Sequence, residues 1–438
     1  MRLAGKISAA IEVLEDFQGR RVPLKTTLAD WARGARYAGA KDRAWISGLC
    51  LDVLRQRQSL AVAMDGETAR GLVLGALRFL WQVPLTEIAE AASEDPHGPG
   101  ALTDAEVTRL ESSYGALLDG AEDWQRGDYP EWLDGSLKAV FGDRTVDVMS
   151  TFANRADIDL RLNTLKATPE KSIAALKPIK GEAIPLLKTA ARVHAPDPSE
   201  RAPAVTVIPA FNKGWVEVQD LGSQIAAAAA GNIKGKQVLD FCAGGGGKTL
   251  ALGALMENSG QLYAYDIDAR RLKPLFHRAK RAGLRNLQVR SPAGGETLDD
   301  LPGKMDVVFV DAPCTGSGTW RRHPDTKWRL TEKQLERRIK EQETVLDNAR
   351  RYVKPGGTLV YVTCSILREE NEDRIEAFLG RSEGVRVIPT LDGLKASENL
   401  VENAAEILAK SETQQGFLRL SPDQIKADGF FVAAMVCD

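Results

Sequence analysis

The C-terminal half of this chain predicts an α/β fold built on a doubly wound parallel β-sheet. From residue 214 onward, short apolar segments of strand length alternate with segments of helical periodicity. Over the first 125 residues, by contrast, the apolar residues recur with helical spacing and strand signals are few. A chain of 438 residues with 43% hydrophobic and 27% charged residues is expected to divide into two or three globular domains.

The composition narrows the class of protein. No apolar run approaches the roughly 18 residues that a membrane-spanning helix needs. Glu12, Glu15 and Asp16 interrupt any signal-peptide core near the N-terminus, so a cytoplasmic protein is expected. Five scattered cysteines without a CxxC pair favour neither a disulfide framework nor a zinc site, and no metal is predicted. The net charge of −2 does not by itself indicate a nucleic-acid partner.

The first predicted domain, residues 1–125, is all helical. Segments 41–64 and 71–83 each place apolar residues on one helical face. The segment 93–104 contains acidic residues, glycine and proline, which is typical of a loop.

The second predicted domain, residues 126–214, is a small mixed α/β module. A helix is expected after Pro130, because proline suits the first turn of a helix. Strands are expected over 157–166, 204–211 and 214–220, where apolar or β-branched residues dominate.

The third predicted domain, residues 215–438, carries the alternating strands and helices. Ligands of such sheets bind beyond the carboxyl ends of the strands. Three acids and two cysteines lie at those ends, and their convergence indicates a functional site: Asp240, Asp266, Asp311, Cys314 and Cys364. The strands are expected over 237–241, 261–268, 286–291, 305–313, 358–365 and, last, 428–436.

The glycine loop in LDFCAGGGGKT (239–249) indicates a nucleotide-like ligand. A dinucleotide fingerprint fails because its third glycine would fall on Thr249, and a P-loop would need glycine where Cys242 stands. GGKT together with VVFVD still mimics an ATPase, so a P-loop NTPase remains an alternative. S-adenosylmethionine fits better: the loop would pack against its methionine part, and Asp266, after the next strand, would hold the ribose hydroxyls.

The two strand-end cysteines, in DAPC (311–314) and TCS (363–365), suggest covalent catalysis. The C5 carbon of cytosine is a poor nucleophile until a thiolate adds at C6. A helix beginning just after Cys364 would help to ionise its thiol. Asp311 could protonate or hydrogen-bond N3, and a second cysteine suits removal of the C5 proton and release of the product. An RNA base would have to be unpaired or flipped.

These motifs together resemble the Sun/Fmu (RsmB-like) family of RNA cytosine-5 methyltransferases. DAPCTGSGTWRRHPDTKWR, VTCSILREEN and DGFFVA carry the resemblance, together with the glycine loop and DIDARRL. It implies a Rossmann-like S-adenosylmethionine methyltransferase domain, preceded by an RRM-like module and a NusB-like RNA-binding domain. By the same resemblance Cys364 is the nucleophile, Cys314 assists release, and Asp311 lies near both methyl donor and base. The expected cofactor contacts are Cys242, Ala243, Gly244, Gly245, Gly246, Gly247, Lys248, Asp266, Arg271 and Asp311.

The chain departs from the family pattern at two places. Gly245 replaces the usual proline of the cofactor loop, which predicts a looser loop. The aspartate usual after the third strand is absent, and SPAGG (291–295) offers Ser291 instead, so adenine recognition stays unassigned.

RNA contacts are expected in TWRRHPDTKWR (319–329), where basic residues stand beside two tryptophans. Arg321, Arg322 and Lys327 are the predicted phosphate contacts. The following segment, 331–343, fits a solvated helix face at least as well.

The sequence therefore predicts S-adenosylmethionine-dependent methylation of cytosine C5 in RNA, with small-subunit ribosomal RNA as the expected substrate. Transfer RNA is an alternative substrate. A non-catalytic RNA-binding assembly factor is an alternative from another class. No obligate protein partner is evident, and a monomer is expected.

Overall fold

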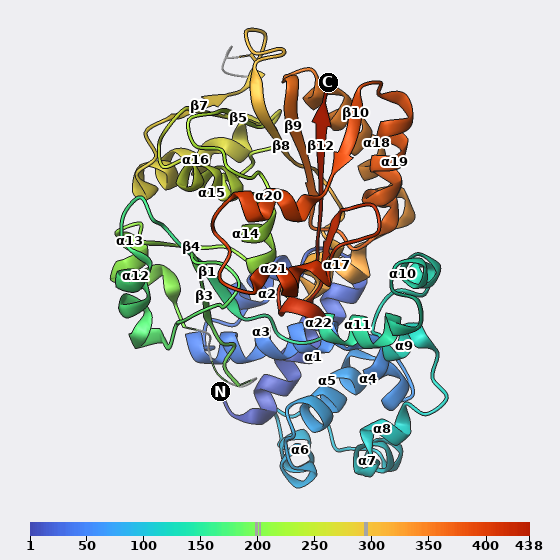
Figure 1. Ribbon diagram of the computed structural model, residues 1–438. Coiled ribbons are helices and arrows are strands. Elements are labelled where there is room, and N and C mark those ends of the chain that lie inside the picture. The colour runs from blue at the N-terminus through green and yellow to red at the C-terminus, as the bar shows by residue number, and fades with distance from the viewer. Residues whose placement is uncertain (198–199, 201–202, 293–296) are drawn as a thin grey trace. The chain divides into compact units, whose positions relative to one another are not determined.

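The computed structural model describes residues 1–197, 200, 203–292 and 297–438, which form two compact units. The helical unit comprises Met1–Arg155, the described part of 195–202, and the segment Thr319–Leu330, which we call the arm. The α/β unit comprises Ala156–His194, Pro203–Gly318 and Thr331–Asp438. Figure 1 gives the element labels used below. No helix of the described residues has the length and apolarity needed to cross a membrane.

The helical unit is organised around its first helix, α1 (Leu3–Arg20). Ile7, Leu14 and Phe17 recur at helical spacing on its buried face, which packs against α3 and α5. The remaining helices of this unit are α2 (Leu24–Gly34), α3 (Ala40–Arg55), α4 (Arg57–Ala63), α5 (Ala69–Gly75), η1 (Ala76–Leu80), α6 (Leu85–Ala92), α7 (Asp104–Glu111), α8 (Tyr114–Leu117), α9 (Asp123–Arg126), η2 (Glu131–Leu133), α10 (Asp134–Phe141), η3 (Gly142–Arg144), α11 (Thr145–Phe152) and, in the arm, α17 (Pro324–Arg329).

The helical unit differs from the predicted first domain, residues 1–125, in two ways. Its helices continue to Phe152, beyond the boundary expected at residue 125, and Leu137 and Phe152 are fully buried. The arm also belongs to it, although the sequence placed residues 319–330 in the catalytic domain. Non-local packing of this kind leaves no sign in the local periodicity.

The middle module contains a four-stranded antiparallel sheet in the order β2-β3-β1-β4. One expected strand is wrong: residues 204–211 form a 3₁₀ turn and a short helix, with Pro209 at the helix start. The elements are β1 (Ile158–Leu162), α12 (Pro169–Leu176), η4 (Lys177–Ile179), β2 (Glu182–Ala183), β3 (Ala190–Val193), η5 (Val205–Val207), α13 (Pro209–Asn212) and β4 (Val216–Val218).

The middle module is part of the same compact unit as the larger sheet. Buried Glu217, on β4, forms ion pairs with Arg278 and Arg281 of α16 (Ala269–Ala282). A glycine is needed at position 214, because a Cβ there would lie 2.1 Å from the carbonyl oxygen of Arg281. The predicted division at residue 214 therefore does not separate two compact bodies.

The larger sheet has the order β10-β12-β9-β8-β5-β6-β7, in which β12 runs antiparallel between its neighbours and the strands from β9 to β7 are parallel. This confirms the predicted α/β fold (Figure 1). Its elements are α14 (Leu221–Ala228), β5 (Gln237–Asp240), α15 (Gly247–Leu255), β6 (Gln261–Tyr265), α16, β7 (Leu287–Arg290), β8 (Met305–Asp311), η7 (Ser317–Thr319), α18 (Glu332–Arg350), β9 (Val353–Thr363), η8 (Arg368–Glu370), α19 (Glu372–Arg381), β10 (Val385–Ile388), α20 (Thr390–Ala396), α21 (Ala404–Ala409), β11 (Leu418–Leu420), α22 (Pro422–Ile425) and β12 (Phe430–Cys437).

The sheet is buried on both faces. Along β9, Val360 and Val362 pack into one core with α14, α15, α20 and α21. Leu359 and Tyr361, at the alternate positions, pack into a second core with α18 and α19. A strand buried on both faces has no polar side, which explains the continuous apolar runs in the sequence.

Candidate active site

The strand order brings the predicted site residues to one edge of the sheet. Strands β9, β8, β5 and β6 are consecutive neighbours and parallel, so their carboxyl ends lie in a row. Cys364 follows β9, Asp311 ends β8, Asp240 ends β5, and Asp266 follows β6.

The two cysteines contact each other. The Sγ atoms of Cys314 and Cys364 lie 3.4 Å apart, within hydrogen-bonding distance for sulfur. The hydrogen bond with Cys364, together with burial, raises the pKa of Cys314 well above its usual range. Cys314 therefore keeps its proton and can donate it to the sulfur of Cys364.

Lys248 provides positive charge at the same place. Its Nζ lies 2.8 Å from Oδ1 of Asp311, and only 10% of its side chain is exposed. Burial lowers the pKa of Lys248, but the carboxylate of Asp311 and the sulfur of Cys364 outweigh this and raise it. The sequence predicts both Lys248 and Asp311 as cofactor contacts, and in the structure the two form an ion pair.

No helix begins directly after Cys364, contrary to the sequence expectation. The chain continues through an irregular stretch to the 3₁₀ turn η8, and α19 begins only at Glu372. The positive charge at this edge of the sheet is therefore that of Lys248, and no helix N-terminus adds to it at Cys364.

The cofactor loop is tied to Asp266. The carboxylate of Asp266 accepts hydrogen bonds from the backbone N–H groups of Gly244 (3.0 Å) and Asp268 (2.9 Å). It also pairs with Arg271 at 3.2 Å, and 57% of the Arg271 side chain is exposed. Arg271 therefore braces the acid from the solvent side. The half-buried Cys242 and the buried Ala243 begin the loop, and burial raises the pKa of Cys242 well above its usual range.

The loop has close neighbours at Gly246. Gly246 has a φ of +81°, and a Cβ there would lie 2.3 Å from Leu275. Gly245, where the family has proline, is not left loose: Arg278 donates a hydrogen bond to its carbonyl oxygen (2.5 Å). Gly247 begins α15.

A buried carboxylate oxygen beneath this loop lacks a donor. Oδ2 of Asp240 accepts a hydrogen bond from Thr249 Oγ1 (2.6 Å), whereas Oδ1 is buried without a partner among the described residues. Burial raises the pKa of Asp240 to about 7. A cationic group, such as the amino group of the methionine part of S-adenosylmethionine, would supply the missing donor. The same bond commits Thr249 to Asp240, whereas a P-loop would use it on a metal.

Sequence reasoning missed two buried residues that hold the cysteine loops, Glu370 and Asn371. The signal was present in LREEN (367–371), directly after the second cysteine, but a charged run is usually a solvated surface. On the adenine side, Ser291 is buried and its Oγ has no described partner, while Ala293, Gly294 and Gly295 of SPAGG lie outside the described residues.

The predicted RNA contacts lie in the arm, within the helical unit. Lys327 is 1% exposed, and its Nζ donates to the carbonyl oxygen of Arg55. Arg321 is also buried, and its carbonyl oxygen accepts a hydrogen bond from Arg55 Nε. Arg322 is half-buried. The burial of Lys327 and Arg321 speaks against a direct phosphate contact by either side chain.

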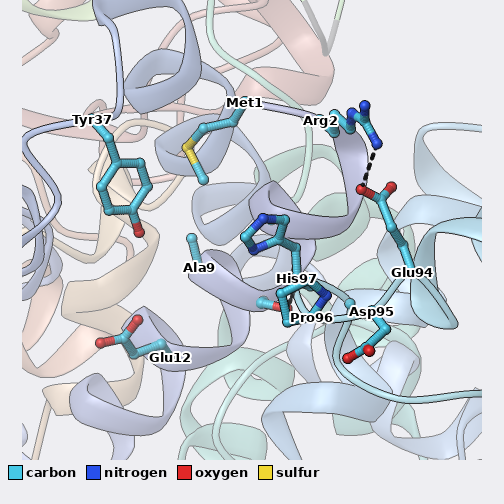
Figure 2. A pocket seen from close by; sticks show the side chains of 12 residues that line it. Met1, Arg2, Ala9, Glu12, Tyr37, Glu94, Asp95, Pro96 and His97 are labelled. Carbon is cyan, nitrogen blue, oxygen red and sulfur yellow. Dashed lines mark hydrogen bonds and ion pairs between the residues drawn. The ribbon is translucent and has the colours of Figure 1, made fainter.

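A hollow of about 940 Å³ lies elsewhere in the helical unit, beside the start of α1 (Figure 2). Tyr37, Glu12 and Glu94 line it, and Arg2 pairs with Glu94 at its rim. None of the predicted site residues lines this hollow.

The strand order, the glycine loop and the acids at the strand ends define the class of protein as a Rossmann-like, S-adenosylmethionine-dependent methyltransferase. The family model described as 16S rRNA methyltransferase RsmB/F matches residues 231–436. The ribosomal RNA small subunit methyltransferase B of Enterobacter sp. (strain 638) is 32% identical, over 78% of this chain and 83% of its own length. The enzyme of the same name from Klebsiella pneumoniae (strain 342) is 29% identical over 90% of both chains.

The chain belongs to the RsmB/F family of RNA methyltransferases, which confirms the predicted Sun/Fmu (RsmB-like) membership. Among solved structures, a methyltransferase homolog protein from Pyrococcus horikoshii is 26% identical, with a TM-score of 0.57 over 74% of this chain and 99% of that one. NSun6 from Pyrococcus horikoshii shares the fold, with a TM-score of 0.58 and 21% identity over 70% of this chain and 98% of that one.

Proposed function

We propose that the protein methylates C5 of a cytosine in small-subunit ribosomal RNA through a covalent bond between Cys364 and C6 of the base. The 3.4 Å contact between the two sulfurs, beside the Lys248–Asp311 pair, is the observation that carries the proposal. The names of the relatives, ribosomal RNA small subunit methyltransferase B, support the choice of RNA.

The reaction begins with the thiolate of Cys364, whose sulfur forms a bond to C6 while the C5–C6 double bond opens. The electron pair passes to C5, which becomes nucleophilic. The glycine loop and Asp266 would hold S-adenosylmethionine, which would supply the methyl group to C5 and leave as S-adenosylhomocysteine. Lys248 stabilises the attacking thiolate, because a buried cation beside a sulfur favours its anionic form.

Asp311 is placed to hold the base. A third of its side chain is exposed, while Oδ1 stays on Lys248. When it carries a proton, the carboxyl group can donate a hydrogen bond to N3, where negative charge accumulates once the thiolate has added.

Release of the product uses the second cysteine. Cys314 donates its proton to the sulfur of Cys364 as the C6–S bond breaks, and its own sulfur then accepts the proton that leaves C5. The electrons of the C5–H bond restore the C5–C6 double bond. Both thiols end protonated, so the proton generated by methyl transfer is accounted for.

Replacement of each cysteine separates the two halves of this scheme. Cys364→Ala is expected to abolish methyl transfer while calorimetry shows unchanged S-adenosylmethionine binding. Cys314→Ala is expected to trap an RNA adduct, seen as a slowly migrating band on a denaturing gel. Normal turnover by Cys364→Ala, or adduct-free turnover by Cys314→Ala, would contradict the assigned roles.

The substrate is tested by bisulfite sequencing of RNA from cells that lack the gene. We expect one methylated cytosine in small-subunit ribosomal RNA to be lost. Reintroduction of the wild-type gene should restore it, whereas the gene carrying Cys364→Ala should not. Loss confined to transfer RNA would contradict the ribosomal assignment.

A further inference from the structure

We propose that Glu370 and Asn371, two consecutive buried residues, are positioning residues that each hold one of the cysteine loops and together set the distance between the two sulfurs. Glu370 holds the loop of Cys314, and Asn371 holds the loop of Cys364. The expected effects on methyl transfer rest on the proposed function, whereas the effect on the thiol pair does not.

Glu370 forms hydrogen bonds with Thr315, the residue directly after Cys314. Its Oε1 accepts a hydrogen bond from the backbone N–H of Thr315 at 2.8 Å, and its Oε2 accepts one from the Thr315 hydroxyl. Gln342, from α18, donates both to Oε1 of Glu370 (3.0 Å) and to the carbonyl oxygen of Pro313 (2.9 Å). The carboxylate thus holds Thr315 directly and Pro313 through Gln342, the residues on the two sides of Cys314.

The setting of Glu370 shows that its carboxylate is not a surface charge. The residue is fully buried, and burial raises its pKa despite hydrogen bonds from Ser365, Thr315 and Gln342. Burial and these hydrogen bonds are the largest influences on that pKa. A buried carboxylate held by hydrogen bonds needs its donors, so the loop that supplies them is fixed in place.

Asn371 does the same for the other loop. Its Oδ1 accepts a hydrogen bond from Thr363 Oγ1 (2.6 Å), and its Nδ2 donates to the carbonyl oxygen of Ser365 (2.9 Å). These are the residues immediately before and after Cys364. Asn371 is fully buried, and both the oxygen and the nitrogen of its side-chain amide hold this loop.

Direct contacts also join the two loops. The hydroxyls of Ser317 and Ser365 lie 3.0 Å apart, and Gly318 donates its N–H to the carbonyl oxygen of Cys364 (2.9 Å). A Cβ at Gly318 would lie 2.1 Å from the carbonyl oxygen of Gly429, so only glycine fits at this position between the two segments. Because Glu370 and Asn371 are joined by a peptide bond, the two anchors hold the cysteine loops at a fixed separation.

Each anchor holds the loop of a different cysteine, so replacing Glu370 should affect product release and replacing Asn371 should affect adduct formation. Glu370→Gln removes one acceptor oxygen, which leaves a Thr315 or Gln342 donor unpaired and displaces Cys314. The adduct is expected to form and to persist, with release slowed about 100-fold, the effect typical of a misplacement of about 1 Å. Asn371→Ala is expected to slow adduct formation by a similar factor.

The control is Glu376→Gln, an exposed position of α19. It should leave both steps unchanged, and all three variants should bind S-adenosylmethionine as the wild type does. The proposal is overturned if Glu370→Gln resolves its adduct at the wild-type rate, or if both anchor variants lose both steps equally.

A second readout needs no RNA. The oxidant diamide converts two adjacent thiols to a disulfide while it is itself reduced to the hydrazine, and the sulfurs must close to about 2.05 Å. Mass spectrometry is expected to show rapid Cys314–Cys364 crosslinking in the wild type and in Glu376→Gln, and about 10-fold slower crosslinking in both anchor variants, as expected for displaced thiols.

Equal crosslinking rates in all four proteins would overturn the positioning role. If the rates differ as expected but the wild type methylates no RNA, the proposed function fails while the positioning role stands. If the wild type methylates RNA and all four crosslinking rates are equal, the proposed function stands while the positioning role fails.

Discussion

At the scale of single residues, the site is built from ionisable groups whose neighbours decide their protonation. Cys314 keeps its proton because Cys364 and burial raise its pKa, while Lys248 keeps its charge because Asp311 offsets the effect of burial. The sequence identified these residues. It did not show that Lys248 and Asp311 form a pair, because they stand 63 positions apart, Lys248 at the start of α15 and Asp311 at the end of β8.

Asp240 should make the stability of the protein depend on pH. Its pKa rises from 3.8 to about 7 on folding, so the folded state favours the protonated form. The resulting penalty is absent below about pH 4, grows between pH 4 and pH 7, and reaches on the order of 4 kcal/mol above pH 7. Asp240→Asn removes it, so the variant should be more stable than the wild type at pH 8 and not at pH 4.

Urea denaturation at both pH values measures this difference. The same variant should bind S-adenosylmethionine more weakly, because an amide cannot pair with its amino group as a carboxylate can. A difference in stability that does not change between pH 4 and pH 8 would contradict the assigned pKa shift.

At the scale of elements, the arm is the feature that the sequence misassigned. Its basic and aromatic residues were expected to face RNA, but Trp328 Nε1 donates to the carbonyl oxygen of Leu54 (2.6 Å), and Trp320 is 1% exposed. Burial lowers the pKa of Lys327 to about 8, although the charge of Asp128 opposes this, and burial raises the pKa of Asp128 to about 6. Asp128 in turn accepts hydrogen bonds from the start of α4. The arm is thus part of the core of the helical unit.

Lys327→Met should therefore reduce stability rather than RNA affinity. Loss of the buried charge is expected to cost about 3 kcal/mol in the free energy of unfolding. The double variant Lys327→Met/Asp128→Asn should recover part of this, because no buried charge is then left unpaired. Denaturant titration of both variants measures the difference.

Salt titration of RNA binding provides the matching control. Lys327→Met should leave the dependence of RNA affinity on salt unchanged. If half-buried Arg322 contacts a phosphate, Arg322→Ala should reduce the slope of the logarithm of affinity against the logarithm of salt concentration by about one. A reduced slope for Lys327→Met would show that this lysine leaves the core to bind RNA.

At the scale of the whole molecule, the middle module takes part in building the cofactor site. Glu217, on β4 of the module, pairs with Arg278, and Arg278 donates to the carbonyl oxygen of Gly245. The module and the cofactor loop are therefore linked through one arginine side chain. This link takes the place of the stiffness that a proline at position 245 would provide.

Glu217→Gln tests this link. The amide keeps the size of the side chain but loses the charge that orients Arg278, so the dissociation constant for S-adenosylmethionine is expected to rise about 10-fold, a loss of about 1.4 kcal/mol. Glu182→Gln, on exposed strand β2 of the same module, is the matched control. Calorimetry measures both, and equal binding by the two variants would contradict a supporting role for the module.

The sequence by itself determined the class of enzyme and the order of the elements, because strand-end residues and a glycine loop are local patterns. It predicted the α/β sheet, the family and the pair of cysteines. The tertiary structure decided what local patterns cannot carry: the contact between the sulfurs, the anchoring of their loops by Glu370 and Asn371, and the burial of the arm in the helical unit. Each of these depends on packing between segments far apart in the chain, where burial rather than residue type determines whether a charge binds a ligand or supports the fold.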